Sequence, residues 1–129
     1  MDFEIDDTPG AKRNLEDIKQ RTQALANDAQ VAGDALKEIS ASAKDAKGNV
    51  EFTLSSQGAI TEVSLSEGFR RNRPEENEQA ILEAYRNAQS SLVEQAQEAI
   101  TEALGKDSQA GKAIAKGFRQ RTMPVSDSD

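Results

Sequence analysis

Residues 48–65 constrain the fold more than any other part of the chain. Their apolar and polar side chains form two strand-like runs joined by a turn, as in a β-hairpin. Residues 50–54 alternate apolar and polar side chains, so one face can be buried and the other exposed to water. Gly58 tolerates the positive φ that a tight turn needs, and residues 59–65 then supply a second strand that runs back beside the first. A two-stranded hairpin alone is only marginally stable in water. It therefore needs cover from further strands or from a helix.

A long helix is predicted before the hairpin. Pro9 suits the first helical position, with Thr8 as its N-cap. Apolar or small side chains then recur in steps of three and four. This seam consists of Leu15, Ile18, Thr22, Leu25, Ala29, Ala32, Leu36 and Ile39. Such a seam is typical of a helix lying on its own domain and equally of one packed against a helix of another subunit. The end of this helix is ambiguous, because residues 39–43 also alternate as a strand does.

A second long helix is predicted after the hairpin. Pro74 suits its first position, Glu75 and Glu76 suit the positive end of its dipole, and Gly105 indicates its end. Residues 106–129 contain several helix breakers and end in Ser and Asp, so we expect a largely flexible tail with a weak helical turn at 113–118. Residues 1–8 form an acidic tail that is also expected to be flexible.

Composition limits the possible functions. A chain of 129 residues indicates one domain, and with 36% apolar and 4% aromatic residues its core is thin, which favours cover by a partner chain. The absence of cysteine and histidine removes disulfides, thiolate metal sites and the usual nucleophile–base pairs. We therefore expect no enzyme, metal site, cofactor or small-molecule substrate. No signal peptide or membrane span is visible, so the expected location is cytoplasmic.

The charge distribution is uneven. The net charge of −7 argues against a generic nucleic-acid binder, but residues 106–129 are net basic. The basic side chains gather in two clusters, which are Arg70, Arg71 and Arg73, and Lys112, Lys116, Arg119 and Arg121. Both are candidates for contacting phosphates. The alternatives are that the arginines pair with neighbouring glutamates and that the tail only solubilises the chain.

Two stretches together resemble the YbaB/EbfC family of small nucleoid-associated bacterial proteins. They are SASAKDAKGNVEFTLSSQGAITEVSLSEGF and a later Ala-rich helix containing ILEAYRNAQSSL, and the similarity covers residues 10–104. The resemblance implies an α+β subunit over residues 9–105, with the order helix, three-stranded antiparallel sheet, helix, that forms a homodimer. It also implies a first strand at residues 39–44, which ends the first helix near Lys37.

The resemblance further implies binding to duplex DNA in the nucleoid. Binding would use mainly the phosphate backbone, with little sequence preference, and the two basic clusters are the candidate sites. The chain departs from the family pattern because it is acidic overall and its first helix has nearly balanced charges. The alternative is a dimeric protein-interaction module, an adaptor or secretion-associated factor, that does not bind DNA.

Overall fold

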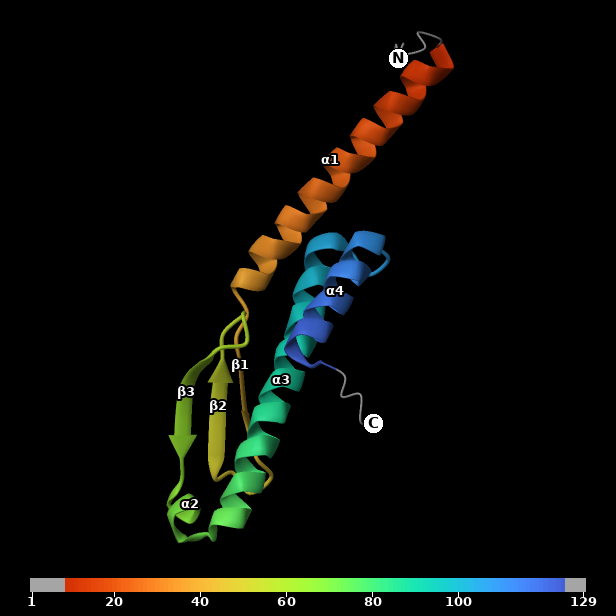
Figure 1. The fold of residues 1–129 in the computed structure, drawn as a ribbon. Helices are drawn as coiled ribbons and strands as arrows, with labels where there is room; N and C mark the ends of the chain where they lie inside the picture. The colour runs from red at the N-terminus through yellow and green to blue at the C-terminus, as the bar shows by residue number, and fades with distance from the viewer. Residues whose placement is uncertain (1–8, 125–129) are drawn as a thin grey trace.

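The computed structural model describes residues 9–124, which form a small sheet with one long helix over a single face and a second long helix that extends from one end (Figure 1). The elements are α1 (Pro9–Lys37), β1 (Ala41–Lys44), β2 (Val50–Leu54), β3 (Ile60–Leu65), α2 (Glu67–Arg71), α3 (Pro74–Leu104) and α4 (Gln109–Thr122). The predicted α+β class, hairpin and two long helices are confirmed. The acidic tail at residues 1–8, with the proposed cap Thr8, lies outside the described residues.

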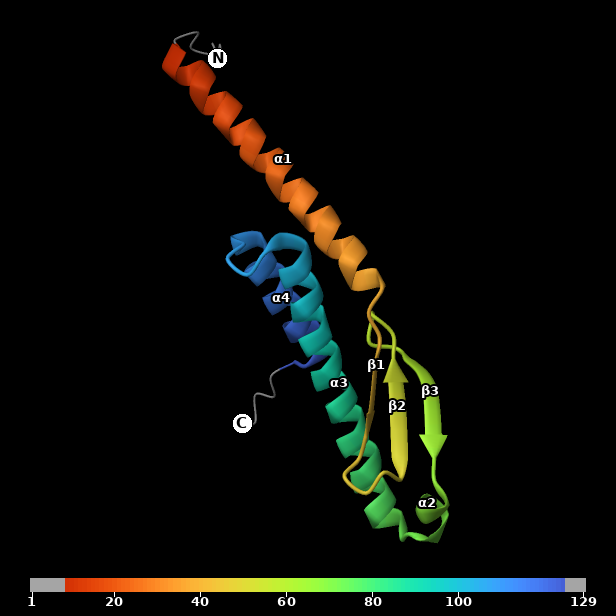
Figure 2. The same cartoon turned by 180° about the vertical axis from the view of Figure 1, so that it is seen from behind.

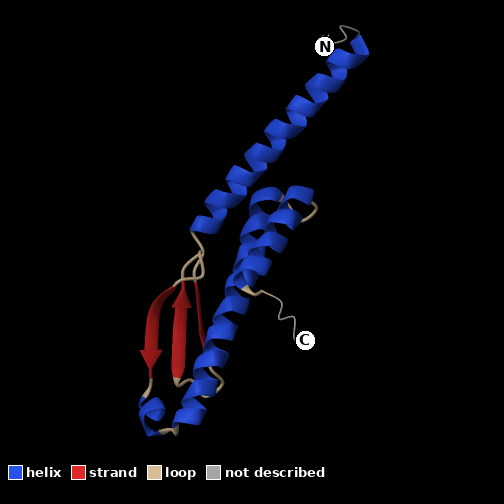
Figure 3. Ribbon diagram, viewed as in Figure 1, coloured by secondary structure: helices blue, strands red, loops and turns tan. Residues whose placement is uncertain are grey.

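The three strands form one antiparallel sheet in the order β1-β2-β3, and α3 lies across one of its faces (Figure 3). The alternation in β2 decides which face is covered, since Val50, Phe52 and Leu54 are all buried. The other face is polar, and there the hydroxyls of Ser42 and Thr53 are hydrogen-bonded across β1 and β2 at 2.7 Å. The result is a two-layer structure with one water-exposed sheet face.

Small side chains let α3 approach the sheet closely. Its buried stripe is Ala80, Ala84, Ala88, Leu92, Ala96 and Ile100. These residues recur every fourth position, so the stripe turns slowly around the helix. Its N-terminal part faces the sheet, and Ile100 near its C-terminal end faces Gly111 of α4. Tyr85 lies beside this stripe and meets Phe52 edge to face, with ring centroids 5.9 Å apart. Because alanine buries little area, a few larger side chains supply most of the apolar burial in the core.

A buried carboxylate organises the turn between β1 and β2. Asp45 is 7% exposed, and its side chain accepts hydrogen bonds from the backbone N–H groups of Val50, at 2.8 Å, and Lys47, at 3.3 Å. Gly48 completes the turn with a φ of +72°, a conformation that favours glycine. The charge is thus buried with hydrogen-bond partners, as a stable interior requires.

Helix α1 extends well beyond the rest of the molecule (Figures 1 and 2). Near its C-terminal end it packs on α3 and α4, where Ala32 is fully buried. Residues 12–27 are all exposed, and we call this segment the α1 arm. The helix ends at Lys37, as the resemblance implied.

Helix α4 corrects the prediction for the C-terminal region. Instead of a weak turn at residues 113–118 in a flexible tail, the structure has a 14-residue helix beside α3. Phe118 is 5% exposed and belongs to the core, and Ser108 caps the helix by accepting a hydrogen bond from the Gly111 N–H at 3.0 Å. At the far end, the Gln89 side chain donates to the Thr122 carbonyl at 2.9 Å. Tertiary contacts and a cap therefore outweigh the helix-breaking composition.

Phe118→Ala should detach α4 while leaving the rest of the molecule folded. Removing a buried phenylalanine side chain costs about 3–5 kcal/mol, which exceeds what a helix of this length can recover from its own hydrogen bonds. Amide hydrogen exchange over residues 109–122 should accelerate by about 100-fold or more, with little change in β2. Unchanged protection in α4 would show that Phe118 does not anchor it.

Candidate nucleic-acid interface

The first basic cluster lies at the corner between α2 and α3, and we call it the corner cluster. Arg70 and Arg71 end the short helix α2, and Arg73 is the N-cap of α3. The corner is held by the Asn77 side chain, which donates to the Phe69 carbonyl at 2.9 Å. All three arginines are exposed. The sequence predicted only the end of the strand region here and missed α2.

Arg73 is tied to its own helix. Its backbone N–H and its Nε both donate to Glu76 Oε1, at 3.2 and 3.4 Å, as in a capping box. The bond from the Arg73 backbone, followed by that from its side chain, lowers the pKa of the Glu76 carboxyl. The contact therefore stabilises the protein above the ordinary carboxyl pKa and is lost as the pH falls through the lowered value. Arg70 and Arg71 form no ion pair within the described residues, so their charges are available to a ligand.

The second cluster lies on α4, and we call it the α4 cluster. Lys112, Lys116 and Arg119 are exposed at spacings of four and three, so they form one stripe on the helix. Gly111 and Phe118 are the buried residues of the same helix, so the stripe points away from α3. Arg121 is also exposed but lies apart. It lines a hollow between α4 and the β2–β3 turn.

The two clusters do not meet within one chain. The corner cluster lies at the N-terminal end of α3, whereas α4 runs back along its C-terminal half (Figure 1). Helix α3 has 31 residues, so its ends lie about 46 Å apart. A single chain can therefore present positive charge at two separated points, but not as one continuous patch.

Sequence reasoning missed a third group of basic residues on the α1 arm. The arm carries Lys12, Arg13, Lys19 and Arg21 against Glu16 and Asp17. The net charge of the whole helix is close to zero because the acidic residues Asp28 and Asp34 follow the arm. Counting charges only over the part of α1 that extends beyond the rest of the protein would have revealed the excess of basic residues. The residue at which α1 stops packing on α3 and α4 depends on tertiary contacts, and no sequence pattern indicates it.

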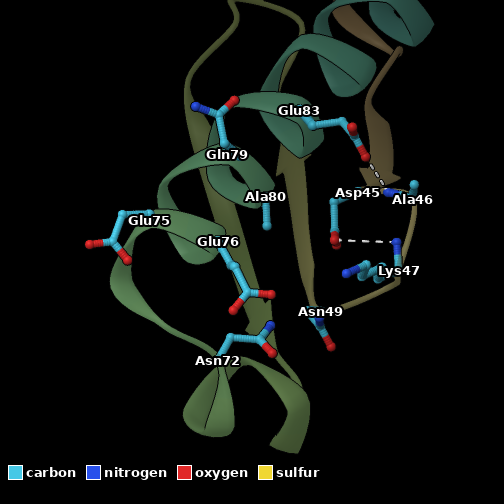
Figure 4. A pocket seen from close by; sticks show the side chains of 10 residues that line it. All are labelled: Asp45, Ala46, Lys47, Asn49, Asn72, Glu75, Glu76, Gln79, Ala80 and Glu83. Atoms are coloured by element: carbon cyan, nitrogen blue, oxygen red, sulfur yellow. Dashed lines mark hydrogen bonds between the residues drawn. The ribbon is translucent and has the colours of Figure 1, made fainter.

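A hollow of about 340 Å³ between the β1–β2 turn and α3 is unsuited to phosphate (Figure 4). Its ionisable lining is Asp45, Lys47, Glu75, Glu76 and Glu83. The Glu83 carboxylate is already engaged by the Ala46 N–H. Four carboxylates against one lysine would repel an anion. Among the residues that the structure describes, no group of His, Cys, Asp or Glu side chains could hold a metal ion.

A family model for YbaB/EbfC matches residues 11–107, which include the helix–sheet–helix unit except the first two residues of α1. The chain belongs to the YbaB/EbfC DNA-binding family. This confirms the resemblance seen in the sequence, and the family consists of nucleoid-associated DNA-binding proteins. Comparison with curated proteins and with solved structures gave no match.

The extent of the YbaB/EbfC match separates the basic groups. The corner cluster and the α1 arm lie inside the matched segment, whereas α4 begins at Gln109, beyond its end. The α4 cluster is thus an addition to the matched unit.

Within residues 9–124, no helix combines the length and apolarity that crossing a membrane requires.

Proposed function

We propose that this YbaB/EbfC protein binds duplex DNA as a homodimer in the bacterial nucleoid, mainly through the phosphate backbone and with little sequence preference. The observation that carries the proposal is the stripe of Lys112, Lys116 and Arg119 on an anchored helix. None of the three forms an ion pair within the described part of the chain. Unpaired, exposed cations fixed on a rigid element are suited to contacting phosphates.

Weak sequence preference follows from the kinds of residue at these sites. Lysine contacts phosphate as a point charge and carries no base information by doing so. The corner cluster and the α4 cluster together would let a dimer neutralise about 6–10 phosphates. The net charge of −7 opposes approach of the acidic body, so binding depends on these local clusters and weakens with salt.

The sheet offers a face for the second copy. Val63 lies opposite Phe52, and Leu65 lies opposite Val50, so both point to the same sheet face as the core. They are nevertheless 54% and 53% exposed, because α3 covers β1 and β2 but not β3. An apolar sheet face left half covered favours association with another apolar surface.

Helix α3 supplies the other wall of this face. Ile81 precedes Tyr85 by one turn on the same side of α3, and the ring of Tyr85 reaches Phe52 in the neighbouring strand. Ile81 is 38% exposed. We propose that an apolar surface between α3 and β3 pairs with its counterpart across a twofold axis, which would also double the basic clusters.

The DNA-binding proposal is tested by removing the charges of the α4 stripe. In the variant Lys112→Gln/Lys116→Gln/Arg119→Gln, we expect affinity for a random 30-base-pair duplex at low salt to fall by about 10- to 100-fold, since each lost phosphate contact removes counterion release. Fluorescence anisotropy measures the change. The matched control removes three exposed lysines elsewhere, Lys37, Lys44 and Lys47, and should weaken binding less. Equal losses in both variants would show that only net charge matters.

A further inference from the structure

The α1 arm carries an apolar seam that nothing in the described chain covers. Leu15, Ile18 and Leu25 are 52%, 58% and 59% exposed. The same seam continues toward the C-terminal end of α1, where Ala32 is buried and Leu36 packs against the core. The seam is therefore covered near the C-terminal end of α1, and the rest of the helix extends past the turn between α3 and α4 (Figure 2).

Within the α1 arm, the charges beside the seam are all positive, and the first acidic flanking residue, Asp28, follows the arm. With Leu15 and Ile18 at the two seam positions of a heptad, the flanking positions in the arm are Lys12, Asn14, Lys19, Arg21 and Ala26. The acidic residues Glu16 and Asp17 fall on the side of the helix away from the seam. The arm thus presents an apolar stripe bordered by positive charge, and this pattern limits what can cover it.

Two occupants fit poorly. DNA phosphates would satisfy Lys19 and Arg21 but would leave Ile18 and Leu25 exposed, because apolar side chains gain nothing from a phosphate backbone. A second α1 arm would cover the apolar side chains, but it would bring like charges together along both edges. A helix with an apolar stripe and acidic borders satisfies both features at once.

We propose that the α1 arm docks an amphipathic helix of another protein, whose apolar stripe is bordered by Asp and Glu. The docked helix would continue the helix–helix packing that α3 and α4 begin. The arm spans 16 residues, about 24 Å, which is long enough for two heptads of contact. This binding goes beyond the proposed DNA function and does not depend on it.

The test uses the full chain and two synthetic peptides of three heptads. Both peptides have Leu at the seam positions; one has Glu at the flanking positions and the other has Lys. Each peptide alone resists self-pairing, because its flanks carry like charges. We expect the Glu-flanked peptide to bind at least about tenfold more tightly in fluorescence anisotropy. Equal affinities, or tighter binding of the Lys-flanked peptide, would overturn the proposal.

Substitutions in the arm locate the binding. Ile18→Glu/Leu25→Glu should weaken binding of the Glu-flanked peptide about tenfold or more, because it places charges in the apolar stripe. The matched control, Gln20→Glu/Gln23→Glu, adds the same charges away from the seam and should have a much smaller effect. Loss of equal size in both variants would place the peptide elsewhere.

Reversing the flanking charges gives a sharper result. Lys19→Glu/Arg21→Glu should change the preference to the Lys-flanked peptide, which a purely structural role of these residues would not do. Unchanged preference would overturn the proposal.

If a second copy of the chain or DNA covers the seam instead, the same variants give different results. If Ile18→Glu/Leu25→Glu lowers the oligomeric state in sedimentation, a second copy covers the seam and the proposal is wrong. It is also wrong if this variant loses DNA affinity but retains peptide affinity. If the unmodified protein binds the Glu-flanked peptide but no DNA, the docking proposal stands and the DNA proposal fails.

Discussion

Leu92→Ala should lower the free energy of unfolding by about 2–5 kcal/mol, the range for removing a fully buried leucine side chain. Leu92 is fully buried on α3 and belongs to the core cluster. Its neighbours in the α3 stripe, Ala88 and Ala96, are too small to fill the space that the substitution leaves. Urea denaturation followed by circular dichroism measures the loss.

The control for this prediction is the same substitution at an exposed position. Leu25→Ala lies in the α1 arm, where the leucine is 59% exposed, and should change stability by no more than about 0.5 kcal/mol. A loss below about 1 kcal/mol for Leu92→Ala would contradict the view that a few large side chains hold an alanine-rich core together.

Val63→Glu should convert the proposed dimer into a monomer. It places a carboxylate at the centre of the β3 face, where the second copy would bury it without a partner, at a cost of several kcal/mol. We expect the dimer dissociation constant to rise by more than about 100-fold, as measured by sedimentation at micromolar concentration. The monomer should remain folded, since Val63 is half exposed within one chain.

Dissociation should also reduce DNA binding. A monomer carries half of the basic clusters and loses the second, effectively intramolecular contact, so the affinity for a long duplex should fall by about 100-fold. Gln57→Glu is the control, because it adds the same charge at an exposed position in the β2–β3 turn. If Val63→Glu sediments as the unmodified protein does, the β3 face is not the dimer interface.

The sequence predicted the elements whose signals are local. Alternation at Val50, Phe52 and Leu54 predicted the hairpin and its buried face, and Pro74 and Gly105 correctly predicted the bounds of α3. The family resemblance resolved the end of α1, which alternation at residues 39–43 had left ambiguous. The signals for the hairpin and for α3 thus lie in the elements themselves or directly beside them.

The failures concern features that depend on distant contacts. Gly111 indicated a break but instead allows close packing of α4 against Ile100, and Phe118 gains its burial from α3. The exposure of the α1 arm depends on where α3 and α4 end, which the pattern of α1 cannot indicate. The candidate site was predicted as two clusters, and only the structure shows that they lie far apart.

The central claim is that the protein binds duplex DNA through its phosphates. Its most direct test is the association constant for two unrelated duplexes of equal length, measured from low to moderate salt. We expect similar constants for both duplexes at every salt concentration. The logarithm of the constant should fall linearly with the logarithm of salt concentration, with a slope of about −5 to −9 for 6–10 phosphate contacts. Absence of binding to either duplex at the lowest salt, where electrostatic contacts are strongest, would contradict the claim.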